Sequence, residues 1–104
     1  MLNAKQELLE IIKNTAKIKC ASISKGYDDS NDSSKRIILK VNYSEEAHQQ
    51  FLTNLDFEYD EGFGTQELYG IVWLEDGTWL SRREYDGSEW WEHHLMPVVP
   101  QECL

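Results

Sequence analysis

The sequence predicts one α+β domain, in which an α-β-β-α segment leads into a three- to four-stranded antiparallel meander and the helices pack on one face of the sheet. The meander is indicated by residues 68–95, which hold all four tryptophans of the chain. Two Asp-Gly pairs, Asp76-Gly77 and Asp86-Gly87, divide this stretch into three apolar or aromatic runs. Because Asp-Gly accepts the positive backbone angles of a tight turn, the three runs are expected to form consecutive hairpin strands.

A first helix is expected at residues 4–15. Asn3 can cap its N-terminus, and Gln6 stands in the capping-box position three residues later. One stripe of the helix is apolar and is expected to face the core. It consists of Leu8, Leu9, Ile12 and Ala16.

Two strands are expected next, at residues 17–25 and 35–43, paired as a hairpin around the polar loop 26–34. In the first strand Ile18 and Ile23 are five residues apart, so they face the same side only if a bulge intervenes. The second strand alternates, which places on one face Ile37, Leu39, Val41 and Tyr43.

A second helix is expected to begin after Ser44, whose hydroxyl can cap the first turn. Its expected buried stripe consists of Ala47, Phe51 and Leu55. Residues 55–60 then alternate apolar with acidic side chains, which predicts a short edge strand with a charged outer face. At the other end of the meander, two prolines predict that residues 97–104 form an extended tail.

The first turn and the strand before it lead to two further predictions. A two-residue loop at Asp76-Gly77 sets a register whose facing pairs are Leu74 with Trp79, Trp73 with Leu80, and Ile71 with Arg82. The strand itself, LYGIVWL, is apolar almost throughout. Such a run is typical of a central strand covered on both faces.

The second turn leaves two registers open. A two-residue loop at Asp86-Gly87 places Glu84 directly opposite Glu89, and like charges in that position are unfavourable. A three-residue loop instead pairs Arg83 with Glu89, so this register is preferred.

Length and composition indicate a single domain over residues 1–104. A chain of 104 residues that is 40% hydrophobic can bury a core without disulfides or metal. Cys20 and Cys103 are far apart in the sequence, which favours free thiols. Since the cysteines favour free thiols and no run approaches the length of a membrane span, a cytoplasmic protein without membrane contact is expected. No ligand motif is present, so no cofactor is expected.

The net charge of −9 is unevenly distributed. Residues 1–43 carry eight Lys or Arg against five Asp or Glu, whereas residues 44–104 carry two against fourteen. A strongly acidic field repels phosphate backbones, so nucleic acid is not an expected partner. A protein partner is expected instead, and a homodimer stays open because an exposed strand edge or tryptophan face can be covered by a second copy.

Two surfaces are candidates for the protein contact. Consecutive strand residues point to opposite faces, so one of Trp90 and Trp91 is expected in the core and the other on the surface. The exposed one, with Arg82 or Arg83, would form a patch of the residue types that are enriched at interfaces. The alternative is an acidic surface that mimics nucleic acid and inhibits a DNA- or RNA-binding enzyme, formed by Asp56, Glu58, Asp60 and Glu61.

Catalytic chemistry has weaker support. A small hydrolase or metalloenzyme would use His93 or His94, but neighbours in a strand diverge, and no paired-ligand spacing accompanies them. A nucleophile such as Ser81 or Cys20 could be combined with a histidine, although no nucleophile elbow is present. No catalytic, cofactor or metal residue is therefore assigned.

The segment DGTWLSRREYDGSEWWEHH, followed by a proline-containing tail, resembles the C-terminal hairpins of small proteins encoded by tailed bacteriophages and prophages. The resemblance covers about the last third of the chain and carries turns and tryptophans but no catalytic residue. It implies a phage or prophage context, in which short acidic proteins often bind host proteins or block defence systems. The expected function is a non-catalytic accessory protein that binds a host protein.

Overall fold

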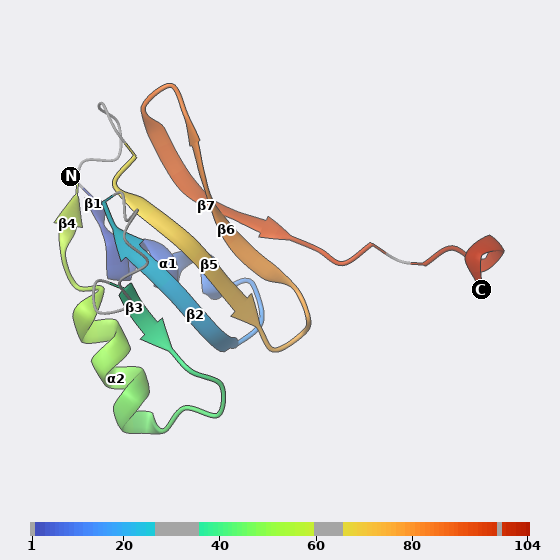
Figure 1. The fold of residues 1–104 in the computed structure, drawn as a ribbon, viewed down its shortest axis with the longest axis horizontal. Helices are drawn as coiled ribbons and strands as arrows, with labels where there is room; N and C mark the ends of the chain where they lie inside the picture. The colour runs from blue at the N-terminus through green and yellow to red at the C-terminus, as the bar shows by residue number, and fades with distance from the viewer. Residues whose placement is uncertain (1, 27–35, 60–65, 98) are drawn as a thin grey trace.

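The structure is a computed structural model that describes residues 2–26, 36–59, 66–97 and 99–104. Most of the expected polar loop 26–34 lies outside these residues, as do Asp60 and Glu61. The elements follow in the order β1 (Leu2–Asn3), α1 (Ala4–Ile12), β2 (Ile18–Lys25), β3 (Arg36–Leu39), α2 (Glu45–Asn54), β4 (Glu58–Tyr59), β5 (Leu68–Leu74), β6 (Trp79–Tyr85) and β7 (Ser88–His94), with a final 3-10 turn η2 (Gln101–Cys103) (Figure 1).

The fold is α+β, with two helices and a five-stranded antiparallel sheet in the order β3-β2-β5-β6-β7. The expected three-strand meander corresponds to β5, β6 and β7, and the expected hairpin of the two earlier strands to β2 and β3. The order is not a plain α-β-β-α segment followed by the meander. Two short strands, β1 and β4, flank the helices and pair with each other in a separate sheet.

Both helices begin at the predicted caps. The Asn3 side chain accepts a hydrogen bond from the Gln6 amide at 3.0 Å, and the Ser44 hydroxyl accepts one from the Ala47 amide at 3.1 Å. The first helix ends at Ile12, three residues earlier than expected, because the chain there enters a turn. In the second helix Phe51 and Leu55 are buried as predicted, but Ala47 is exposed.

The two N-terminal strands show how local irregularities decide which side chains are buried. The β2–β5 register shifts between Ile18 and Cys20, and this bulge allows both Ile18 and Ile23 to enter the core. The next strand, β3, ends at Leu39, because Asn42 adopts a positive φ of 59° and turns the chain. Val41 is therefore exposed, contrary to the predicted alternation.

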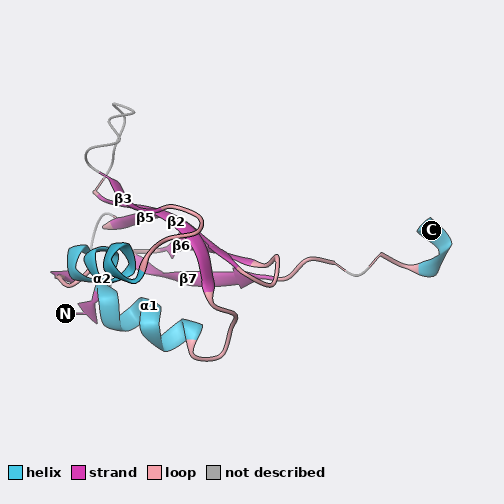
Figure 2. Ribbon diagram, turned by 90° about the horizontal axis from the view of Figure 1, so that it is seen from below, coloured by secondary structure: helices cyan, strands magenta, loops and turns pink. Residues whose placement is uncertain are grey.

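The helices lie on one side of the five-stranded sheet, with α1 beneath β2 and β5 and α2 beside β3 (Figures 1 and 2). The other face of the sheet, called here the open face, has no helix of the described residues over it (Figure 2). Ile71 is 37% exposed and Trp73 is 40% exposed on this face. The strand is central in the sheet, as predicted, but the two helices of the described residues pack on a single side, so they do not supply the second cover that the apolar run predicts.

The register of the first hairpin differs from the prediction by one residue. Trp73 faces Trp79, Val72 faces Leu80, and Ile71 faces Ser81. The loop has three residues and ends at Gly77, whose φ is 86°. This register places the pair Val72 and Leu80 in the core and the two tryptophans on the open face.

The second hairpin has the register that charge repulsion argued against. Asp86 and Gly87 both have positive φ, at 51° and 87°, which is the geometry of a two-residue type I′ turn. Glu84 faces Glu89 across the strands. The repulsion between the two carboxylates is reduced because each has its own partner. Glu89 is buried and accepts a hydrogen bond from Arg82, whereas Glu84 is exposed and accepts one from the Gly87 amide at 3.1 Å.

Gly70 is required where β2 and β5 approach closely. Its φ is 142°, and a Cβ atom there would lie 2.2 Å from the Ser22 carbonyl oxygen. We expect Gly70→Ala to destabilise the fold by about 3 kcal/mol or more, through the combined strain and overlap.

The matched control is Gly77→Ala, which shares the positive φ but has nothing within 4 Å of the added methyl group. It should cost only about 1 to 2 kcal/mol. Urea midpoints measure both variants, and equal losses would contradict the proposed close approach.

Candidate functional site

A buried arginine lies at the centre of a polar cluster that joins several elements of the fold. The Arg82 side chain is 1% exposed and extends from β6 into the space between the sheet and α1. Its Nη1 donates to Glu7 at 2.9 Å, and its Nη2 donates to Glu89 at 2.8 Å and to the Tyr59 hydroxyl at 2.6 Å. One guanidinium therefore connects residues of α1, β4, β6 and β7.

Further contacts complete the surroundings of this guanidinium. It lies over the rings of Tyr59 and Trp91, 5.4 and 5.1 Å from their centroids, in cation–π geometry. Glu89 also accepts from the amides of Glu67 at 2.7 Å and Leu68 at 3.2 Å, which ties the start of β5 to the cluster. Two buried N–H groups, Arg82 Nε and Trp91 Nε1, have no hydrogen-bond partner among the described residues.

The cluster carries more negative than positive charge. Burial, followed by the hydrogen bond that Tyr59 donates to Glu7, raises the pKa of the Tyr59 phenol well above its ordinary value, so Tyr59 is neutral. Burial alone would lower the pKa of Arg82, but its hydrogen bond to Glu89 and the charge of Glu7 outweigh that effect and raise it. The one guanidinium is therefore paired with two carboxylates, those of Glu7 and Glu89.

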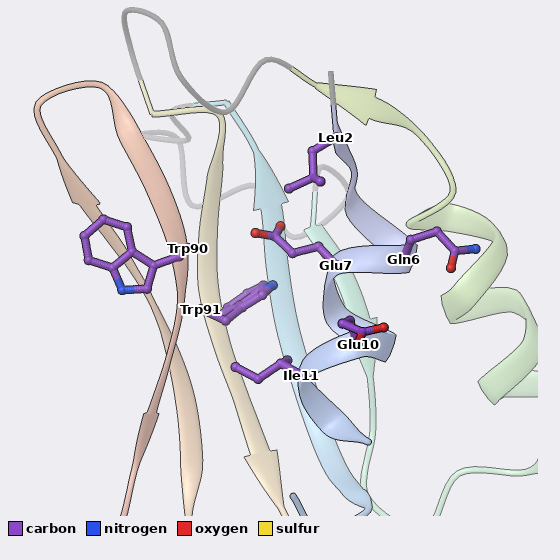
Figure 3. Close-up of a pocket in the computed structure, with 7 residues that line it drawn as sticks. All are labelled: Leu2, Gln6, Glu7, Glu10, Ile11, Trp90 and Trp91. Atoms are coloured by element: carbon purple, nitrogen blue, oxygen red, sulfur yellow. The ribbon is translucent and has the colours of Figure 1, made fainter. Parts of the chain in front are cut away.

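A groove of about 490 Å³ runs between α1 and β7 beside this cluster (Figure 3). Glu7 belongs to both, since it binds Arg82 and lines the groove. Trp91 extends toward α1, whereas Trp90 lies on the other side of the β7 backbone (Figure 3). Most of the lining surface is apolar, and the lining residues are Leu2, Gln6, Glu7, Glu10, Ile11, Trp90 and Trp91.

The open face of the sheet is the second candidate surface. Large apolar side chains are exposed on three of its strands, namely Ile38 (46%), Ile71 (37%), Trp73 (40%) and Trp90 (41%). A hollow of about 320 Å³ lies over β2 and β5, with Tyr69, Ile71 and Trp73 among its lining residues. Exposed apolar surface that spans several strands is typical of a binding surface.

The four predicted contact residues separate into two groups. Trp91 and Arg82 are buried, whereas Trp90 and Arg83 are at the surface. The predicted split of the tryptophan pair between faces is therefore confirmed. Arg83 pairs with Glu92 at 2.9 Å in an exposed salt bridge. The sequence does not predict Trp73 as a surface residue. It lies two positions from Ile71 in β5, so the two side chains share a face, and both are exposed there.

Two of the four residues of the predicted acidic surface belong to the described part of the chain. Asp56 and Glu58 are both exposed, and Asp56 accepts a hydrogen bond from the Asn3 side chain at 3.0 Å. Asp60 and Glu61 lie outside the described residues.

The histidines point to opposite faces and have separate partners. His93 contacts the Thr78 hydroxyl at 2.9 Å. His94 contacts the Ser81 hydroxyl at 2.6 Å and stacks on Trp79, with ring centroids 5.3 Å apart. No acidic side chain orients His94 in the described part of the chain, and no group of three metal-ligating residues is found there. The serine–histidine contact thus lacks the third member of a catalytic triad.

Comparison with protein-family models, with curated protein sequences and with solved structures finds no match. The resemblance to phage-encoded proteins therefore stays a prediction. Among the described residues, no helix has the length and apolar character needed to cross a membrane.

Removal of the buried arginine should be strongly destabilising. In Arg82→Met the carboxylates of Glu7 and Glu89 lose their shared cation, and we expect a loss of about 3 to 5 kcal/mol in the free energy of unfolding. Arg83→Met, which removes only the exposed pair with Glu92, should cost about 1 kcal/mol or less. Urea unfolding compares the two, and similar losses would show that the cluster does not hold the fold together.

Tyr59 should make stability sensitive to high pH. Because its pKa is raised in the folded state, its contribution is complete below the ordinary tyrosine pKa of about 10 and is lost as the pH rises through the folded-state value. Tyr59→Phe should be less stable at neutral pH and lose less stability above pH of about 10. Tyr85→Phe, at an exposed position, is the control and should follow the wild type. Unfolding free energies across alkaline pH measure the effect, and parallel profiles for all three proteins would contradict it.

Proposed function

We propose that this protein is a protein-binding domain whose contact surface is the open face of the sheet. The observation that carries the proposal is the exposure of Ile38, Ile71, Trp73 and Trp90 on that face. The apolar area that these side chains leave in water favours association with a complementary surface. Tryptophan is also among the residue types that most often dominate binding energies.

The charges on the open face indicate what kind of partner fits it. Arg83 and Glu92 neutralise each other, Arg36 lines the hollow over β2 and β5, and the centre of the face holds Ile71, Trp73 and Ser81. A partner held there would be bound mainly through apolar contacts, so its affinity should change little with salt. An acidic surface around Asp56 and Glu58 would instead bind a basic enzyme in a manner that weakens steeply with salt.

The test combines two double variants with affinity capture at low and high salt. Ile71→Ser with Trp73→Ser removes apolar surface from the open face. The control, Met96→Ser with Val99→Ser, removes exposed apolar side chains from the tail that leads away from the domain (Figure 1). We expect a protein retained at both salt concentrations by the wild type and the control, and lost with the open-face variant.

Two results would contradict the proposal. One is a partner retained equally by all three proteins, and the other is a partner released at high salt, which would favour the acidic surface. Sedimentation of the purified protein separates a foreign partner from a second copy, because self-association through this face would be abolished by the same open-face variant.

A further inference from the structure

We propose that the groove between α1 and β7 binds a lysine or arginine side chain, presented by an extended segment of a partner protein that pairs with the free edge of β7. This inference rests on the proposed protein-binding function and names the chemistry of the segment that is recognised. Its evidence comes from the groove and the strand edge rather than from the open face.

The lining of the groove suits a side chain that is apolar along its length and positively charged at its end. Ile11, Leu2 and the Trp91 ring supply apolar and aromatic walls, while Trp90 borders the groove from the β7 backbone. Glu7 and Glu10 add carboxylates from consecutive turns of α1 (Figure 3). Lysine and arginine bury their methylene stems on apolar surface, and a cation gains further from an aromatic ring and a carboxylate.

The charge balance explains why a cation is favoured over a neutral group. Arg82 is shared between Glu7 and Glu89, so the cluster beside the groove keeps one negative charge without a matching cation. Glu89 is compensated by two backbone amides and is 2% exposed, whereas the Glu7 side chain is 15% exposed and lines the groove. An incoming cation would thus meet a partly desolvated carboxylate, where its attraction is stronger than in open water.

Glu10 is also available to an incoming cation. It pairs with Lys13 at 3.1 Å, but both side chains are largely exposed, at 73% and 67%. Exposed pairs of neighbouring helix residues are weak, so this bridge can be exchanged for a better-buried one at little cost.

The edge of β7 supplies the backbone contacts for an extended segment. This strand is last in the sheet order and seven residues long, and the described residues place no further strand beside it. In an antiparallel sheet, alternate residues of an edge strand direct their N–H and C=O groups outward, where an added strand can pair with them. A segment paired there lies next to the groove, since Trp90 and Trp91 belong to both.

The test uses three peptides of about seven residues, the length of an ordinary strand, that differ only at one central position. That position holds lysine, acetyl-lysine or glutamate in an otherwise identical threonine- and valine-containing sequence. We expect the lysine peptide to bind about tenfold more tightly than the acetyl-lysine peptide, which corresponds to about 1.4 kcal/mol, and the glutamate peptide to bind most weakly. Calorimetric titration measures the affinities. Equal affinities, no binding of the lysine peptide, or preference for glutamate would each overturn the proposal.

The location is tested by the four tryptophan indole N–H signals in NMR spectra. The lysine peptide should shift the signals of Trp90 and Trp91 and leave those of Trp73 and Trp79 in place. Shifts confined to Trp73 and Trp79 would overturn the groove and place the peptide on the open face instead.

A pair of charge-reversal variants separates local from global electrostatics. Glu10→Lys places a cation at the groove and should weaken the lysine peptide about tenfold, whereas Glu102→Lys makes the same change in net charge in the tail and should have little effect. Urea midpoints establish that both variants fold. Equal weakening by both would overturn the groove as the site.

The experiments can contradict the groove proposal and the open-face proposal independently of each other. The Ile71→Ser and Trp73→Ser double variant should keep its affinity for the lysine peptide, because neither residue lines the groove. Loss of protein capture with intact peptide binding would support both proposals, whereas unchanged capture with intact peptide binding would reject only the open face.

Discussion

The fold depends on a single buried guanidinium. Arg82 connects α1, β4 and β7 to its own strand, β6. Glu89 also accepts hydrogen bonds from backbone amides at the start of β5, so this strand is joined to the same cluster. A buried ion pair of this kind contributes little net stability, but the loss of one partner is costly because the other charge is left uncompensated. We therefore expect the cluster to act mainly on the choice of strand register rather than on net stability. A shift of one residue between β6 and β7 would turn Glu89 to the open face and leave the buried Arg82 without this carboxylate. The pair therefore favours the observed register of the last hairpin.

Features encoded by neighbouring residues could be predicted from the sequence. The caps at Asn3 and Ser44, the three-strand meander and the split of the tryptophan pair follow from short-range patterns, and all are present. The cluster could not be predicted in the same way, since Glu7 is 75 residues from Arg82 in the sequence. Arginine is seldom fully buried, so the sequence predicts Arg82 or Arg83 in a surface patch, and the like-charge argument favours the other register of the second turn.

The apolar run LYGIVWL predicts more cover for its strand than the helices of the described residues supply. Residues apolar on both sides of a strand indicate that both sides are covered. Within the described chain, α1 and α2 cover only one, and Ile71 and Trp73 stay exposed on the other. The mismatch between what the strand's composition requires and what the helices supply is the main physical reason to expect a second molecule on the open face.

The two surfaces meet at β7, and this shared strand links their binding properties. Trp90 is exposed with the open face and also lines the groove beside Glu7 and Glu10. A segment added at the edge of β7 would extend the sheet, and with it the apolar surface on which the rest of a partner could rest. The groove would add a charged contact that is sensitive to salt, whereas the open face would add apolar contact that is not. A partner using both would keep most of its affinity at high salt and lose its preference for a basic segment.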